Sequence, residues 1–112
     1  MKIGSRNIGN GKPVYVIAEA GVNHNNKLSL AYKMIDLAVS AGADAVKFQS
    51  FIAKNMQLKE SVKPRYQHNL KWSYYEQLRR SQIPFEYQEK LFEYCKKKKI
   101  TFLSTPYDEE SV

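Results

Sequence analysis

Short apolar runs alternate with longer amphipathic segments along this chain of 112 residues. Three of the runs are typical of β-strands, because β-branched and aromatic side chains are concentrated in them. They are Val14–Ala18, Ala45–Gln49 and Ile100–Leu103. Strands that are separated by helices form a parallel sheet, so the pattern predicts an α/β fold.

The segments between the strands have the period of amphipathic helices. Apolar residues recur at helical spacing from Leu28 to Ala41, and Gly42 stands where a C-terminal cap is expected. A second helix follows Pro84, which suits the first helical position. Its expected buried side consists of Phe85, Gln88, Leu91, Phe92 and Cys95. The repeating unit is therefore β–α, with right-handed crossovers.

Two further segments lack this periodicity. Residues 1–13 contain three glycines and the pair Asn10-Gly11, which predicts a small β-hairpin ahead of the first strand. Between residues 50 and 82 we expect a long loop with one helical turn, rich in aromatic and amide side chains at 66–75. Long loops in compact domains often bind ligands, but such aromatic side chains suit a barrel rim or a subunit contact equally well.

Charge and composition narrow the function classes. The chain has 18 Lys and Arg against 11 Asp and Glu, a net charge of +7, and one run of lysines, Lys96–Lys99. Because this run closes a helix, where cations interact favourably with the dipole, we interpret it as a solvated helix end. No apolar run suits a membrane span or a signal peptide, and the lone Cys95 permits neither an intrachain disulfide nor a zinc cluster. We expect a cytoplasmic protein that binds neither nucleic acid nor membrane.

Polar side chains gather on one face of the predicted sheet. Side chains alternate between the two faces of a strand, so Lys47 and Gln49 share a face of the second strand. Glu19 and Thr105 end the corresponding faces of the first and third strands. In parallel α/β folds the chemistry lies beyond the carboxyl ends of the strands. This arrangement therefore indicates an enzyme.

The residues alone leave several roles open. Lys47 could bind a phosphate or carboxylate, form a Schiff base as in an aldolase, or make a structural ion pair with Glu19. His24 could ligate a metal, but a single histidine beside several asparagines is more often a hydrogen-bonding residue of its loop.

Three motifs of the chain, in this order and spacing, resemble the N-terminal third of the sialic acid synthase family. They are Ile17–Asn25, Gly42–Gln49 and Phe102–Pro106. The family includes N-acetylneuraminate, legionaminate and pseudaminate synthases, and the stretches 51–55 and 104–112 look more like the first two. The resemblance implies a (β/α)8 TIM barrel, of which residues 1–112 would carry about the first three β–α units. The remaining strands and a C-terminal antifreeze-like domain would lie outside this chain.

The resemblance also implies an activity. Family members condense phosphoenolpyruvate with an N-acylated amino-sugar aldehyde, such as N-acetylmannosamine or a 2,4-diacetamido-trideoxyhexose. The product is a nine-carbon 2-keto sugar acid, and phosphate is released. Such an enzyme is a C–C bond-forming transferase of class EC 2.5.1. The family enzymes are usually domain-swapped homodimers and use Mn²⁺ or Mg²⁺, which histidines on later strands hold. We therefore expect no metal ligand in this chain and no activity from residues 1–112 alone.

Five residues match functional positions of that family. By resemblance, Lys47 and Thr105 bind phosphoenolpyruvate, Lys47 through an oxyanion and Thr105 through its hydroxyl or backbone N–H. Gln49 would hydrogen-bond the sugar. Glu19 matches an acid that contacts the sugar or water, or transfers a proton. Asn69 matches an active-site asparagine on the long loop once one gap is allowed.

Two other functions remain as alternatives. One is a different TIM-barrel lyase, such as a Schiff-base aldolase. Borohydride would trap the substrate of an aldolase on Lys47 but would trap nothing on Lys47 of a synthase. The other is a non-catalytic truncated fragment that associates through its open sheet edge.

Overall fold

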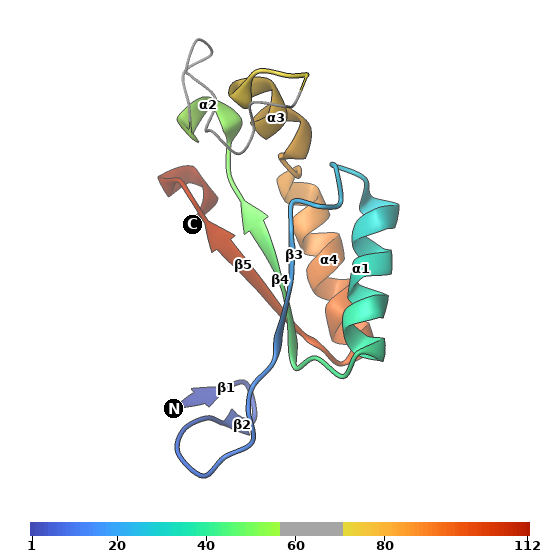
Figure 1. The fold of residues 1–112 in the computed structure, drawn as a ribbon, viewed down its shortest axis with the longest axis vertical. Helices are drawn as coiled ribbons and strands as arrows, with labels where there is room; N and C mark the ends of the chain where they lie inside the picture. Colours follow the sequence, from blue (N-terminus) through green and yellow to red (C-terminus); the bar gives the residue numbers. More distant parts are fainter. Residues whose placement is uncertain (57–70) are drawn as a thin grey trace.

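A three-stranded parallel sheet forms the centre of the computed structural model, which describes residues 1–56 and 71–112. Its strands lie in the order β3 (Ile17–Gly21), β4 (Ala45–Ser50) and β5 (Thr101–Pro106). The two long helices, α1 (Leu28–Ser40) and α4 (Phe85–Lys98), lie side by side on one face of this sheet (Figure 1). The prediction of β–α units around a parallel sheet is confirmed.

Smaller elements lie at the two ends of the sheet (Figure 1). The antiparallel pair β1 (Lys2–Ile3) and β2 (Arg6–Asn7) lies near the end where β3 begins. At the opposite end, where the parallel strands finish, lie α2 (Ala53–Met56), α3 (Tyr74–Ser81) and a 3₁₀ turn, η2 (Glu109–Ser111). None of the helices in the described ranges is long and apolar enough to cross a bilayer.

The hydrophobic core fills the space between the sheet and the two long helices. Val46 and Phe48 of β4 point into it, against Ile35 of α1 and Leu91 and Cys95 of α4, and all five are buried. Burial raises the pKa of the Cys95 thiol to about 11, because the apolar surroundings disfavour the thiolate. The stripe expected on the first helix is confirmed by its buried residues Ala31, Ile35 and Ala38.

The first core strand begins later than predicted. We expected Val14–Ala18, but β3 starts at Ile17, and Val14 is 82 % and Val16 51 % exposed. The side chain of Asp44 accepts a hydrogen bond from the Val16 backbone N–H at 2.8 Å. The carbonyl of Val16 accepts from the backbone N–H groups of Asp44 and Ala45. Val16 therefore belongs to a junction with the next strand, although its β-branched side chain favours a strand.

Two boundaries elsewhere also differ from the sequence prediction. The hairpin exists, but its turn lies between Ile3 and Arg6 with Gly4 at φ +56°, and Asn10-Gly11 belongs to a later turn. Pro84 is the residue before α4 instead of its first residue, since its ψ of 145° is extended while its fixed φ of −59° suits both positions.

The buried side of α4 is narrower than predicted. Leu91 and Cys95 are buried, and Gln88 donates to Ser50 Oγ of β4 at 3.0 Å, but Phe85 and Phe92 are each 51 % exposed. Phe92 packs edge-on against Phe102 of β5. Since β5 is the outer strand of this sheet, the outer side of α4 has little surface to cover it.

The lysine run closes α4 as predicted. Lys96, Lys97 and Lys98 form its last turn, and Lys99 caps it in the left-handed conformation at φ +58°. Lys98 pairs with Asp36 of α1 at 2.8 Å, which ties the two helices together. This hydrogen bond from Lys98 lowers the pKa of the Asp36 carboxyl.

Candidate active site

The face of the sheet opposite the helices carries the polar residues singled out in the sequence. In the strand register Glu19 lies beside Lys47, and Gln49 lies beside Thr105. Because neighbours along a strand point to opposite faces, these four side chains leave the sheet on the side away from Phe48. The structure thus brings four of the five predicted site residues to one face. Asn69 lies outside the described residues.

Lys47 and Glu19 form an ion pair across β3 and β4. Lys47 Nζ lies 3.0 Å from Glu19 Oε2, and the two side chains are 35 % and 48 % exposed. An ion pair that is this accessible adds little to stability, because water screens it. Its main consequence is orientation, since the carboxylate holds the ammonium above the open face. The ion pair considered from the sequence is therefore present, and it does not prevent Lys47 from binding an anion as well.

A β-bulge brings a third side chain close to this pair. The register between β3 and β4 shifts between Glu19 and Gly21, and Gly21 has a φ of +55°, which glycine adopts without strain. A Cβ at this position would lie 3.6 Å from Glu19 Oε1 and 3.7 Å from Gln49 Nε2. Gly21 therefore leaves room for the carboxylate and the amide to approach one another. Sequence reasoning assigned it no such role, although a glycine at a strand end is a signal for a bulge.

His24 lies in the loop after β3 and is fully buried. Its Nδ1 accepts a hydrogen bond from the backbone N–H of Asn26 at 3.1 Å, and its ring lies 6.0 Å from that of Phe48. Burial lowers the pKa of His24, so the ring is neutral near pH 7. The histidine is a hydrogen-bonding residue of its loop, as the sequence suggested.

A metal site is not found in the described part of the chain. Within residues 1–56 and 71–112, no three His, Cys, Asp or Glu side chains are grouped so that they could hold an ion. These residues therefore offer no donor set for the divalent metal that the family resemblance implies.

A cavity of about 420 Å³ adjoins Gln49 at the carboxyl end of the sheet. Its walls come from the loop after β3, from the segment after β4, from α3 and from the residue after β5. The residues that form them include Val22, Phe51, Met56, Gln77, Leu78 and Tyr107. A volume of this size lies within the roughly 300–1,000 Å³ of small-molecule sites.

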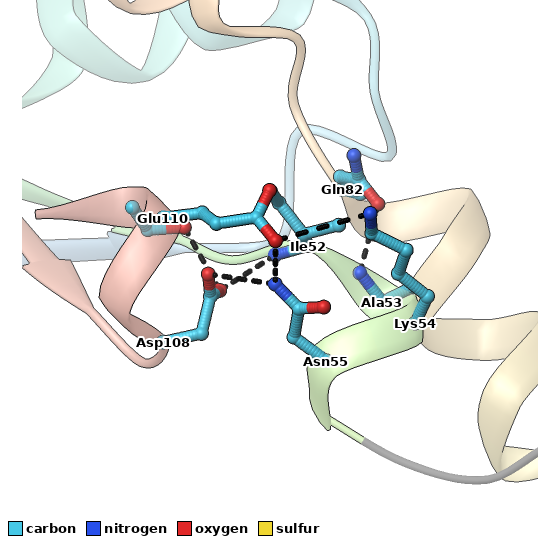
Figure 2. A network of polar contacts seen from close by, with 8 residues as sticks. Ile52, Ala53, Lys54, Asn55, Gln82, Asp108 and Glu110 are labelled. Atoms are coloured by element: carbon cyan, nitrogen blue, oxygen red, sulfur yellow. Dashed lines mark hydrogen bonds and ion pairs between the residues drawn. The ribbon is translucent and has the colours of Figure 1, made fainter.

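The loops around this cavity are joined by a polar network centred on Asp108 (Figure 2). One carboxylate oxygen accepts from the Ile52 backbone N–H and the Ser111 hydroxyl, each at 2.8 Å, and the other accepts from Asn55 Nδ2 at 3.2 Å. Desolvation alone would raise the pKa of Asp108, but these hydrogen bonds together lower it. The end of β5 is thereby tied to the start of α2.

Three further contacts extend this network (Figure 2). Lys54 Nζ lies 3.8 Å from Glu110 Oε1. Asn55 Nδ2 also donates to Glu110 Oε1 at 3.1 Å, and Gln82 Oε1 accepts from the Ala53 backbone N–H at 2.9 Å. Sequence reasoning missed this network. The available signal was an Asp followed three residues later by Ser at the start of a short helix, where such side chains often accept backbone or side-chain hydrogen bonds.

Sequence reasoning also underestimated α3. The predicted loop contains two helices in its described part, and the second of them spans eight residues. Ser73 caps α3 by accepting from the Glu76 backbone N–H at 3.1 Å. This Ser-x-x-Glu spacing is the capping-box signature, and it would have located the helix despite its weak apolar period.

Comparison with known proteins gives consistent matches along the chain. The model of the NeuB family matches residues 34–112. The chain is 45 % identical over 106 residues to the N,N'-diacetyllegionaminic acid synthase of Campylobacter jejuni. This match covers 90 % of this chain and 31 % of that protein. It is 40 % identical over 110 residues to the spore coat polysaccharide biosynthesis protein SpsE of Bacillus subtilis. This match covers 98 % of this chain and 30 % of that protein.

A solved structure has the same fold. The crystal structure of an N-acetylneuraminic acid (sialic acid) synthetase from Leptospira borgpetersenii superposes with a TM-score of 0.79 at 31 % identity. The match covers 99 % of this chain and 35 % of that one. The fold is therefore part of a TIM barrel, as predicted, and the chain spans about a third of the length of the relatives it matches.

Proposed function

Because this chain belongs to the NeuB family, we propose that it supplies part of the active site of a sialic-acid-type synthase. The enzyme condenses phosphoenolpyruvate with an N-acylated amino-sugar aldehyde to a nine-carbon 2-keto sugar acid. A carbon–carbon bond forms between C3 of phosphoenolpyruvate and the aldehyde carbon, water adds at C2, and phosphate leaves. One water is consumed for each phosphate released, so the reaction balances.

The observation that carries this proposal is the arrangement of Lys47, Glu19 and Gln49 at the carboxyl end of the sheet. An ammonium group at a fixed position stabilises an anionic substrate where negative charge shifts during the reaction, and Lys47 supplies it. Glu19 orients that ammonium through the 3.0 Å ion pair. Its other oxygen faces the bulge at Gly21, beside Gln49, where it can contact the sugar or a water.

Gln49 and Thr105 complete the part of the site that this chain provides. They are neighbours in the register of β4 and β5, so a ligand that reaches one can reach the other. We assign Thr105 to phosphoenolpyruvate and the Gln49 amide to the sugar, because an amide both donates to and accepts from hydroxyl and acetamido groups. A divalent ion would add Lewis-acid chemistry, and we place its ligands outside the described residues. We further propose a cytoplasmic homodimer.

The aldolase alternative is less compatible with this geometry. The contact of Lys47 Nζ with Glu19 Oε2 at 3.0 Å suits an ammonium that binds an anion, whereas a Schiff base requires an amine free to attack a carbonyl carbon. The segments after β4 and β5 resemble legionaminate and N-acetylneuraminate synthases, so we propose a sugar substrate of those two enzyme types.

Release of phosphate tests the proposal. The full-length protein should release phosphate only when phosphoenolpyruvate, Mn²⁺ and an N-acylated amino sugar are all present. The two sugars to assay are N-acetylmannosamine and the 2,4-diacetamido-trideoxyhexose. Phosphate release without sugar, or borohydride trapping of a substrate on Lys47, would contradict a synthase.

A further inference from the structure

We propose that the cavity beside Gln49 receives the N-acyl group of the amino sugar, and that Met56 and Leu78 determine which acyl groups fit. This inference rests on the proposed function. It assigns a binding role to side chains of α2 and α3 that neither the strand pattern nor the polar face of the sheet points to.

The position of Gln49 links the cavity to the open face. Gln49 borders the cavity, and its amide nitrogen also lies near Gly21, on the side of Glu19. Lys47 does not border the cavity, whereas Gln49, two residues along the same strand, does, so an anion at Lys47 and a group inside the cavity would occupy different places. A sugar whose aldehyde carbon faces the phosphoenolpyruvate would therefore place its neighbouring acylamino substituent at or beyond Gln49.

The walls of the cavity have the mixed character that an acylamino group requires. Phe51, Met56 and Leu78 offer apolar surface, which suits the alkyl part of the group. Gln49 and Gln77 offer amide donors and acceptors, which suit its N–H and C=O. A hydroxyl-rich part of a sugar would leave the apolar walls without a matching partner.

The charges around α3 favour a neutral occupant. Among the described residues, none that lines this cavity is charged. The cationic side chains Lys27, Arg79 and Arg80 line a neighbouring depression, which also includes Trp72 and shares Gln77 and Ser81 with the cavity. Arg80 stacks over the Trp72 ring at 3.8 Å. Of the two hollows beside α3, only that depression offers counter-charges to an anion, whereas a neutral acyl chain fits the cavity beside Gln49.

The Asp108 network holds two walls of the cavity in place. It joins the segment that follows Phe51 to the segment that follows Tyr107, through the hydrogen bond from the Ile52 backbone N–H. The bond from the Ala53 backbone N–H to Gln82 connects the same region to the residue after α3. Walls that are fixed in this way can discriminate between acyl groups that differ by a methylene, because the cavity cannot adjust freely.

The test varies the length of the acyl chain, and it enlarges the cavity in one variant and reduces it in another. The full-length enzyme is assayed for phosphate release with N-acetyl-, N-propanoyl- and N-butanoylmannosamine. If it accepts only the diacetamido sugar, the same three acyl groups are placed on the nitrogen next to the aldehyde carbon of that sugar. Met56→Ala enlarges the cavity and should raise the kcat/KM of the N-butanoyl sugar relative to the N-acetyl sugar about tenfold. Leu78→Phe reduces the cavity and should lower the same ratio about tenfold. The KM for phosphoenolpyruvate should change less than about twofold in both variants, since Lys47 lies outside the cavity.

Arg79→Ala is the matched control, because Arg79 follows Leu78 on α3 but lines the cationic depression instead. It should leave the acyl preference unchanged. An active enzyme whose preference moves in neither cavity variant, or moves in the same direction in both, would overturn the assignment of the cavity and leave the synthase proposal standing. A wild-type enzyme that is inactive with every N-acylated sugar, the diacetamido sugar included, would overturn both.

Discussion

The two faces of the central sheet are built from the same three strands and have opposite characters. On the helix side of β4, Val46 and Phe48 are buried in the core. Lys47 and Gln49, which alternate with them along the strand, lie on the other side and are partly exposed. Lys47 forms an ion pair with Glu19 there. Adjacent residues of one strand therefore contribute separately to the core and to the site that we propose.

This separation explains how the site is positioned. The core fixes the backbone of β4, and the alternation of side chains then places Lys47 and Gln49 above the open face without any loop being involved. Sites that are built on strands are held more rigidly than sites on loops. Substitutions on the two faces should accordingly change different measured quantities.

The largest expected effect is on the helix face. Phe48→Ala should reduce the free energy of unfolding by about 3–5 kcal/mol, because it removes a fully buried ring and leaves a cavity. Chemical denaturation of the full-length protein measures the loss. A variant as stable as the wild type would show that this side of the sheet is not the main core.

The next effect is on the open face, one residue away. Lys47→Met should reduce kcat by on the order of 10²-fold or more, because it removes a preorganised cation. Its melting temperature should remain close to that of the wild type, since the ion pair with Glu19 is half exposed. Phosphate release and thermal melting of the same preparation check this, and near-normal turnover would remove Lys47 from the site.

A smaller and more selective effect is expected two residues further along. Gln49→Ala should raise the KM for the amino sugar about tenfold, because a hydrogen bond to the sugar is lost, and should leave the KM for phosphoenolpyruvate nearly unchanged. Initial rates with each substrate varied in turn provide the measurement. Equal increases in both KM values would contradict a contact with the sugar alone.

The smallest effect concerns the loop network and depends on pH. The pKa of Asp108 is lowered in the folded protein, so its carboxylate stabilises the fold above its unfolded pKa of about 3.9. That stabilisation is lost as the pH falls through the lowered folded value. Asp108→Asn should therefore lower the melting temperature near pH 7, and the difference from the wild type should shrink as the pH approaches 2.

The matched control for this prediction is Glu110→Gln. Glu110 belongs to the same network through Asn55, and glutamine keeps an oxygen that can accept that hydrogen bond. The substitution also removes the ion pair with Lys54, which is exposed and adds little to stability. Its melting temperature should follow that of the wild type across the pH range. A constant difference between Asp108→Asn and the wild type at every pH would show that the Asp108 charge is not involved.

The order of strands and helices and the two faces of the sheet could be predicted because they follow from the local period of the side chains. The late start of β3 could not, because it depends on the hydrogen bond between Val16 and the distant Asp44. The exposure of Phe85 and Phe92 likewise depends on which elements lie beside α4. Tertiary context decides such features.

The candidate site divides in the same way. Lys47 and Gln49 could be placed on one face from their spacing, and the register confirms that Glu19 and Thr105 join them there. The roles of these residues stay predictions. The bulge at Gly21 and the contacts of Asp108 escaped sequence reasoning, since each requires residues that lie far apart in the sequence or a local break in the strand register.

The claim that the substrate site lies on the face of the sheet away from the helices is tested most directly by the binding of phosphoenolpyruvate. Calorimetric titration with phosphoenolpyruvate, in the presence of Mn²⁺ and without sugar, is applied to the full-length wild type and to the Lys47→Met and Gln49→Ala variants. We expect Lys47→Met to lose measurable binding and Gln49→Ala to bind like the wild type. Undiminished binding by Lys47→Met would contradict the account.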